Sequence, residues 1–264
     1  MTGYDRRLLL LGPKRNHVLE LWEVERYGAD SFGDPDYVSV FGMRPEAWYA
    51  RGVRLLGRTA VECTRDVLAK AIGADVARIA STCPTAGATL VVDPFCGSGN
   101  TLHWITSHVP DARGVGVELD PTVFDLTRRN LAALALPIEV VHADHRTALP
   151  EVRPRADDLV VTFVAPPWGE ALSETAGLDL RRTSPPVAEI LDLLNGVFGT
   201  NRLLCAIQVF ERTDEASLEE LRPRFDWSEV RIYDCNASGQ NHGILLGTRG
   251  WAPDRRENGG GGWR

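Results

Sequence analysis

The chain has 264 residues, of which 44% are hydrophobic and 25% are charged, values that are ordinary for a globular protein. Its length fits one α/β domain of about 170 residues with an appended segment. A net charge of −7 argues against a broad nucleic-acid-binding surface, because phosphate contacts need a surplus of Lys and Arg. No apolar run approaches the roughly 20 residues of a membrane-spanning helix, so no membrane partner is expected.

The N-terminus and the cysteines predict a cytoplasmic protein. Leu8–Leu11 follow two arginines, but Pro13 and two basic residues come directly afterwards, which is unlike a signal peptide. The cysteines are Cys63, Cys83, Cys96, Cys205 and Cys235. Because their spacing matches neither a zinc site nor a disulfide framework, we expect reduced thiols and no bound metal.

Residues 1–87 are predicted to form an N-terminal extension, mainly helical, that acts as a lid or platform for a substrate. Residues 17–27 fit either a helix or a strand, and residues 30–36 are predicted to be a loop. Pro45 suits the first turn of a helix. Apolar residues then keep a helical period, in one long helix or two, up to Gly73 as a C-terminal cap.

From residue 88 onwards, strand and helix patterns alternate. Strands are predicted at residues 89–93, 114–119, 138–141, 158–164, 202–209, 229–233 and 243–247. Helices are predicted at residues 100–108, 121–134, 186–197 and 217–221. This alternation indicates an α/β fold, a doubly wound, Rossmann-like seven-stranded sheet over residues 88–257 whose last two strands pair as an antiparallel edge. Residues 258–264, with four consecutive glycines, are predicted to be a disordered tail.

The first predicted strand leads into a glycine turn, and the next helix opens directly after it. The turn reads Asp93-Pro94-Phe95-Cys96-Gly97-Ser98-Gly99, followed by Asn100-Thr101. A strand, a glycine turn and a helix in this order bring backbone amides close to a nucleotide-like ligand. The turn differs from the dinucleotide GxGxxG pattern, because the third, helix-packing glycine is missing at its expected place.

Two acids at neighbouring strand ends narrow this ligand to S-adenosylmethionine (SAM). Glu118, followed by Leu119, ends the second strand, where a carboxylate accepts hydrogen bonds from both ribose hydroxyls. Asp144 follows the third strand, where it is placed to accept a hydrogen bond from the adenine amino group. The predicted cofactor-binding residues are Asp93, Pro94, Phe95, Cys96, Gly97, Gly99, Asn100, Thr101, Glu118, Leu119, Asp144 and Ala165.

Ala165-Pro166-Pro167-Trp168 closes the fourth strand at the carboxyl edge of the sheet, beside the glycine turn. Two prolines give a rigid bend without amide donors, so the carbonyls before them are free to accept hydrogen bonds from an amino group. Trp168 offers a flat π-face to a planar or cationic acceptor. The predicted catalytic residues are Ala165, Pro166, Pro167 and Trp168, which position the acceptor, and Glu170, which contributes electrostatically.

Together these motifs resemble class I SAM-dependent methyltransferases, and in particular the trimethylguanosine synthase family, which methylates N2 of guanine in RNA caps. The shared residues are Asp93-Pro94-Phe95-Cys96-Gly97, Gly99-Asn100-Thr101, Glu118-Leu119-Asp120-Pro121, Asn130, Asp144, Pro166-Pro167-Trp168-Gly169, Gly177-Leu178-Asp179-Leu180-Arg181 and Ser184-Pro185. The resemblance covers residues 88–194 and implies a SAM-binding enzyme that methylates nitrogen.

Two positions depart from the family pattern. Ala165 stands where the family carries Ser, Asn or Asp, so a side-chain hydrogen bond to the acceptor amine is missing. Glu170 stands where glycine is usual, and its carboxylate would repel phosphate and attract an ammonium group. Both departures weaken the transfer of guanine specificity to this chain.

The acceptor is therefore expected to be a small amine-bearing metabolite. It would bind between residues 1–80 and the turn formed by Pro166, Pro167 and Trp168, here called the PPW turn. RNA guanine stays open as an alternative, because four arginines are predicted to form one basic helix face: Arg44, Arg51, Arg54 and Arg58. A non-catalytic SAM-binding module is the third hypothesis, motivated by Ala165. The candidates for a base are Glu170, Asp179, His145 and His242, of which His242 is predicted to be a surface residue. The oligomeric state is left open.

Overall fold

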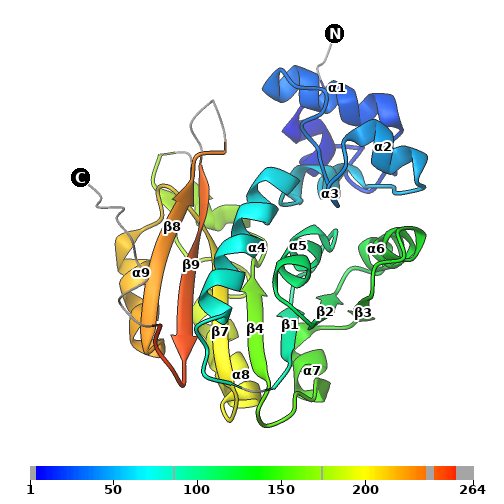
Figure 1. The fold of residues 1–264 in the computed structure, drawn as a ribbon. Coiled ribbons are helices and arrows are strands. Elements are labelled where there is room, and N and C mark those ends of the chain that lie inside the picture. The colour runs from blue at the N-terminus through cyan, green and yellow to red at the C-terminus, as the bar shows by residue number, and fades with distance from the viewer. Residues whose placement is uncertain (1–3, 86, 174, 236–240, 254–264) are drawn as a thin grey trace.

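A seven-stranded sheet lies at the centre of the computed structural model, which describes residues 4–85, 87–173, 175–235 and 241–253 (Figure 1). Its strands are β1 (Thr89–Asp93), β2 (Ala112–Glu118), β3 (Ile138–His142), β4 (Leu159–Val164), β7 (Arg202–Phe210), β8 (Trp227–Tyr233) and β9 (His242–Arg249). They lie side by side in the order β3-β2-β1-β4-β7-β9-β8. The five strands β3, β2, β1, β4 and β7 are parallel to one another, whereas β9 pairs antiparallel with both β7 and β8. The predicted α/β sheet and its antiparallel edge pair are confirmed.

Helices cover both faces of this sheet, as a doubly wound fold requires. The helices among the described residues are α1 (Leu21–Phe32), α2 (Pro45–Ala50), α3 (Gly57–Glu62), α4 (Asp66–Ala80), α5 (Asn100–His108), α6 (Pro121–Ala133), α7 (His145–Ala148), α8 (Val187–Phe198) and α9 (Glu215–Leu221). Of these, α1, α2 and α3 belong to the N-terminal extension. A π-helical turn spans Arg7–Leu11, and 3-10 turns span Leu149–Glu151, Gly169–Ala171 and Arg222–Arg224. A short hairpin, β5 (Leu172–Ser173) with β6 (Gly177–Leu178), follows the PPW turn.

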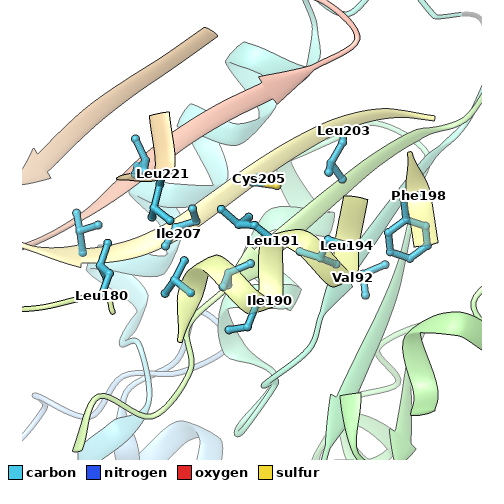
Figure 2. Close-up of a cluster of buried hydrophobic side chains, with 14 of the residues drawn as sticks. Val92, Leu180, Ile190, Leu191, Leu194, Phe198, Leu203, Cys205, Ile207 and Leu221 are labelled. Carbon is cyan, nitrogen blue, oxygen red and sulfur yellow. The ribbon is translucent and has the colours of Figure 1, made fainter. Parts of the chain in front are cut away.

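The core has one layer on each side of the sheet. Every residue of β4 is buried, which explains its unbroken apolar run, since parallel strands with both faces covered read as continuous hydrophobic stretches. On one face, Leu191, Leu194 and Phe198 of α8 pack against Val92 and Leu203 of the sheet (Figure 2). The opposite face is covered by α4 and α5.

The N-terminal extension divides into more helices than its apolar period predicts. Residues 17–27 contribute to a helix, α1, which runs on to Phe32 and ends at the left-handed Gly33. The helical period expected to run from Pro45 to Gly73 is broken into α2, α3 and α4. Gly73 is not a cap but lies inside α4, where a Cβ would stand 2.7 Å from the carbonyl oxygen of Trp104 on α5. A glycine here lets the two helices approach closely.

The four arginines expected on one helix face are spread over separate elements, so that prediction is wrong. Arg58 lies on α3 and pairs with Asp120 at 2.7 Å, with only 13% of its side chain exposed. Arg54 lies in the connection before α3, where its guanidinium stacks over the ring of Tyr49 at 3.5 Å. Arg44, which precedes α2, pairs with Asp36. Arg54 and Arg58 thus use their charges within the protein, whereas Arg44 is 77% exposed and Arg51 is exposed too.

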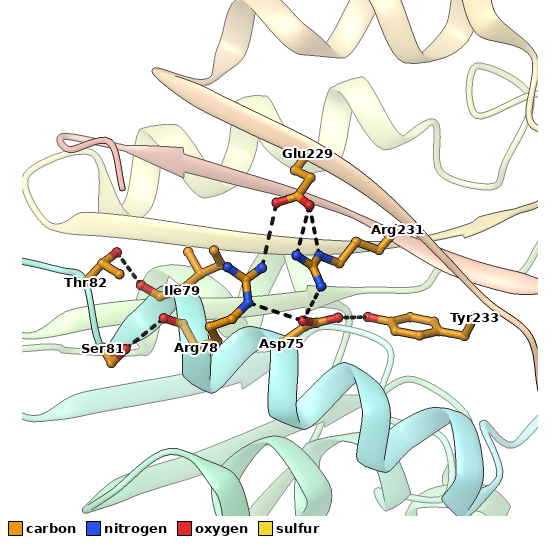
Figure 3. Close-up of polar contacts among 8 residues, drawn as sticks. All are labelled: Asp75, Arg78, Ile79, Ser81, Thr82, Glu229, Arg231 and Tyr233. Atoms are coloured by element: carbon orange, nitrogen blue, oxygen red, sulfur yellow. Dashed lines mark hydrogen bonds and ion pairs between the residues drawn. The ribbon is translucent and has the colours of Figure 1, made fainter. Parts of the chain in front are cut away.

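A network of ion pairs and hydrogen bonds connects α4 to the edge strand β8 (Figure 3). Asp75 of α4 accepts hydrogen bonds from Arg231 at 2.9 Å and from the Tyr233 hydroxyl at 2.8 Å. Glu229 joins the network through Arg231 at 3.0 Å and Arg78 at 3.7 Å. Since α4 also packs its apolar side onto the sheet, this helix is part of the core, while the predicted domain boundary at residue 87 stays a prediction.

No helix in the described ranges combines the length and apolarity that crossing a lipid bilayer requires. The predicted tail at residues 258–264 lies outside the described residues.

Candidate active site

The glycine turn connects the buried end of β1 with the start of α5. The Asp93 carboxylate, only 2% exposed, accepts a hydrogen bond from the Phe95 amide at 3.0 Å. Burial raises the pKa of Asp93 to about 7. Gly97 and Gly99 both have positive φ, at 49° and 76°, which the turn requires and which favours glycine. A Cβ on Gly97 would meet nothing closer than 4.0 Å, so this side of the turn is open to a ligand.

Glu118, at the end of β2, is tied to the same turn. One carboxylate oxygen accepts from the Gly97 amide at 3.0 Å, and the other accepts from the Asp120 amide at 2.8 Å. Burial raises the pKa of Glu118. A carboxylate offers about four lone-pair positions, so these two bonds leave acceptor capacity for ligand hydroxyls. The ribose role of Glu118 stays a prediction, and its position beside the turn suits it.

The next predicted cofactor residues follow β2 and β3 at the same edge. Leu119 is 64% exposed and offers an apolar surface beside Glu118. Asp144 begins α7, where its carboxylate accepts from the Arg146 amide at 2.8 Å. His145, a candidate base, is buried against the ring of Phe95 with centroids 4.9 Å apart, and burial lowers its pKa.

Two buried asparagines hold the N-terminal extension against this edge. The Asn100 side chain accepts from the Phe41 amide and donates to the Thr64 carbonyl, both at 2.7 Å. Asn130 on α6 accepts from the Arg54 amide at 2.9 Å and donates to the Arg54 carbonyl at 2.8 Å. Asn100 is predicted to bind the cofactor, but its side-chain amide is hydrogen-bonded to the extension. A contact between Asn100 and the cofactor would therefore be made by its backbone.

The PPW turn closes β4 and carries an aromatic cluster. The half-buried indole of Trp168 stacks on the imidazole of His242, with centroids 5.2 Å apart and planes inclined by 18°. Phe210 at the end of β7 meets Trp168 edge to face at 6.4 Å. Glu170 is exposed in the following 3-10 turn. Asp179, another candidate base, is bonded to the Arg181 guanidinium at 2.8 Å, which lowers its pKa.

His242 is not the surface residue that its polar surroundings in the sequence predict. It is the first residue of β9 and pairs with Phe210 at the end of β7. Because β9 runs antiparallel, its first residue lies at the carboxyl edge of the parallel strands, where the PPW turn lies. The half-buried imidazole places Nδ1 3.3 Å from Gln208 Nε2. Burial lowers the pKa of His242 to about 4, so the ring is neutral at pH 7.

A cavity of about 100 Å³, here called the N-terminal cavity, lies between the extension and this edge. It is lined by Tyr37, Val38, Ala60, Val61, Glu62, Cys63, Thr64, Arg65, Leu68, Gln208, Cys235 and His242. Since His242 also stacks on Trp168, the cavity lies one ring away from the PPW turn. A second hollow, of about 210 Å³, is lined by residues that include His145 and Glu189. Neither hollow is lined by a residue of the PPW turn, and only the N-terminal cavity is lined by His242, which stacks on Trp168.

Glu62, Gln208 and Asn130 were not among the predicted site residues. The sequence contains a signal for Gln208, because it is a polar residue inside the otherwise apolar run of β7. The sequence contains no such signal for Glu62, since it is one of several acids in a helical pattern. Glu62 and Gln208 come together in the lining of the cavity because the extension folds back over the sheet.

No protein-family model matches the chain. A protein of Streptomyces pristinaespiralis named 4-amino-L-phenylalanine/4-methylamino-L-phenylalanine methyltransferase is 34% identical over 127 residues, which are 48% of this chain and 39% of that protein. The match thus spans less than half of the relative's length. The solved METTL16 methyltransferase domain is 16% identical and covers 71% of each chain with a TM-score of 0.51.

The N-terminal domain of human METTL16, solved in complex with S-adenosylhomocysteine (SAH), is 16% identical over 66% of each chain, with a TM-score of 0.45. The likeness to trimethylguanosine synthases in particular stays a prediction. The chain has the fold of the class I SAM-dependent methyltransferases.

Proposed function

We propose that this chain is a SAM-dependent N-methyltransferase whose acceptor is a small aromatic amine. The observation that carries the proposal is the position of the N-terminal cavity. Its wall includes His242, which stacks on Trp168 of the PPW turn, at the sheet edge where the glycine turn also lies. A cofactor cradle and a cavity for the acceptor, at one edge of the sheet, are the two parts that a methyl transfer needs.

The residues at the glycine turn fit SAM. Gly97 has an open side and a positive φ, so its backbone can approach a ligand closely. In this proposal Glu118 accepts hydrogen bonds from the ribose hydroxyls, and Asp144 and Leu119 contact the adenine ring. When bound there, SAM supplies an electrophilic methyl group on a sulfonium. The protein's contribution is to bind, to orient and to exclude water.

The PPW turn is suited to orient an amino group. In this proposal the carbonyls of Ala165 and Pro166 accept hydrogen bonds from the acceptor amine, and the two prolines that follow them keep the turn rigid. Ala165 has no side-chain acceptor, so orientation depends on these carbonyls and on the surface of Trp168. Glu170 adds a negative charge nearby that favours an amine over a phosphate.

The character of the cavity favours an aromatic ring. Tyr37, Val38, Val61 and Leu68 give it apolar walls against which a ring can pack. The Streptomyces relative is named for an acceptor of this kind, an amino group on a phenyl ring. An RNA acceptor finds less support, since the net charge is −7 and Arg44, Arg54 and Arg58 are paired or stacked within the protein.

The proposal is tested by incubating the purified protein with methyl-labelled SAM and, separately, 4-amino-L-phenylalanine, guanosine and total RNA. Label transfer to the aromatic amine is expected, with a product one methyl group heavier. Label in RNA, with a steep loss of rate as salt rises, would instead indicate an RNA methyltransferase. If SAH binds but no label moves to any of the three, the binding-module hypothesis gains and the proposal fails.

A further inference from the structure

Glu62 stands out among the polar residues that line the N-terminal cavity. It is the last residue of α3 and is exposed, and it makes no hydrogen bond or ion pair with any described residue. Arg15 and Arg58 act on it only electrostatically. Although the side chain is accessible, the surrounding protein raises the pKa of its carboxyl. The carboxylate is thus incompletely solvated and keeps its acceptor capacity.

Three other polar side chains of the cavity wall, those of Arg65, His242 and Gln208, already have partners within the protein. The Arg65 guanidinium donates to the Cys235 carbonyl at 2.6 Å and lies over the Tyr37 ring at 4.2 Å. His242 lies within hydrogen-bond distance of Gln208. Glu62 is therefore the acid of this wall that can receive a donor from a ligand. A carboxylate in such a place binds a cationic donor more strongly than a neutral one.

Glu62 and the PPW turn belong to different parts of the acceptor site. Trp168 lies beyond His242, whereas Glu62 lies on the side formed by the extension. A molecule whose reacting nitrogen is held by the PPW turn would bring its opposite end to Glu62. That end must carry a group that suits a carboxylate.

We propose that Glu62 is a specificity-determining residue that binds a fixed ammonium group of the acceptor, distinct from the nitrogen that is methylated. This inference rests on the proposed function and deepens it, because it specifies an acceptor with two amino groups, one neutral and aromatic and one cationic. An aromatic amino acid that carries a ring amino group has this chemistry. Glu62 holds its α-ammonium while the PPW turn orients the ring amine.

The test compares two acceptors that differ only in the α-amino group, 4-amino-L-phenylalanine and 3-(4-aminophenyl)propionic acid. With the wild-type protein, kcat/KM is expected to be at least about tenfold higher for the amino acid. In Glu62→Gln this preference falls to about twofold or less, chiefly through a higher KM for the amino acid. Glu62→Asp, which keeps the charge, restores part of the preference.

Calorimetry gives a readout that does not depend on turnover. In the presence of SAH, Glu62→Gln is expected to bind 4-amino-L-phenylalanine at least about fivefold more weakly, with the affinity for SAH unchanged within about twofold. Glu46→Gln, an exposed acid on α2, serves as the matched control and should behave as wild type.

The outcomes separate the two proposals. Equal losses for both acceptors in Glu62→Gln, or a parallel loss of SAH affinity, would overturn the role of Glu62 and leave the methyltransferase proposal standing. A parallel loss of SAH affinity would indicate that Glu62 binds the ammonium group of the cofactor instead. A wild-type protein that binds SAH but neither binds nor methylates the two aromatic amines would overturn both proposals.

Discussion

The imidazole of His242 lies parallel to the indole of Trp168, with ring centroids 5.2 Å apart and an angle of 18° between the planes. The two residues come from the start of β9 and the turn after β4, 74 positions apart in the sequence. The stack covers part of one face of Trp168 and leaves less of it for an acceptor. It also links the PPW turn to the wall of the N-terminal cavity.

Replacing Trp168 is expected to separate turnover from cofactor binding. Trp168→Ala removes the ring that supports His242 and should lower kcat at least about a hundredfold, because misplacement by about 1 Å can cost that much. The affinity for SAH, measured by calorimetry, should stay within about threefold of wild type. Trp168→Phe keeps an aromatic surface and should retain part of the activity. A collapse of SAH affinity in Trp168→Ala would place this residue in the cofactor site or the core.

Glu118 is expected to act on cofactor affinity in two ways. Glu118→Ala removes the predicted acceptor of the ribose hydroxyls and also leaves the Gly97 and Asp120 amides without their carboxylate partner. We expect SAH to bind at least about tenfold more weakly, equivalent to about 1.4 kcal/mol. Glu139→Ala, an exposed acid on β3, is the control and should bind SAH normally. Unchanged affinity in Glu118→Ala would contradict the ribose assignment.

The pKa of His242 predicts a loss of stability in acid. Its pKa is lowered from 6.5 to about 4 in the folded protein, so the unfolded chain binds the proton first as the pH falls. The contribution of His242 to stability is therefore complete above about pH 6.5 and is lost between about pH 6.5 and pH 4. His242→Gln should show a smaller drop in Tm than wild type between pH 7.5 and pH 4.5, by roughly 3 °C.

The matched control for this measurement is His17→Gln, since His17 is exposed near the N-terminus. Its Tm should fall with pH as steeply as that of the wild-type protein. An equally steep fall in His242→Gln would show that the acid sensitivity comes from other groups, such as the buried His145, whose pKa is also lowered.

Asn130 is expected to hold the extension in place. Asn130→Ala leaves the amide and the carbonyl of Arg54 without partners at a site where Asn130 itself is 2% exposed. We expect a loss of about 1–3 kcal/mol in the free energy of unfolding, measured by urea titration. Limited proteolysis should cut faster around residues 50–56. Asn16→Ala, at an exposed position, should change neither.

Most of the sheet follows from the sequence because its signals are local. β1 and β4 are short β-branched runs that end at an acid and at two prolines, and both were predicted within a residue of their observed bounds. Asp93, Glu118 and Asp144 could be placed at one edge because parallel strands share their carboxyl ends. The position of each strand end required no knowledge of distant contacts.

The errors arise where distant segments meet. Gly73 resembles a helix cap in the sequence, and only the approach of Trp104 on α5 explains a glycine inside α4. His242 was predicted to be exposed because its neighbours are polar, whereas its burial depends on β9 entering the sheet between β7 and β8. Glu62 acquires its place in the cavity from the packing of the extension, which no local pattern encodes.

The packing of α4 sets where this protein can be recombined with its relatives. Leu68, Ile72 and Val76 of this helix cover one face of the sheet, while the cavity-lining part of α3 ends at Glu62. A chimera that exchanges only residues 4–63 would replace most of the cavity wall contributed by the extension and keep the sheet covered. One joined at residue 88 would also exchange α4 and so replace the apolar side chains that cover this face of the sheet. The junction between α3 and α4 is thus the place to graft a new acceptor preference.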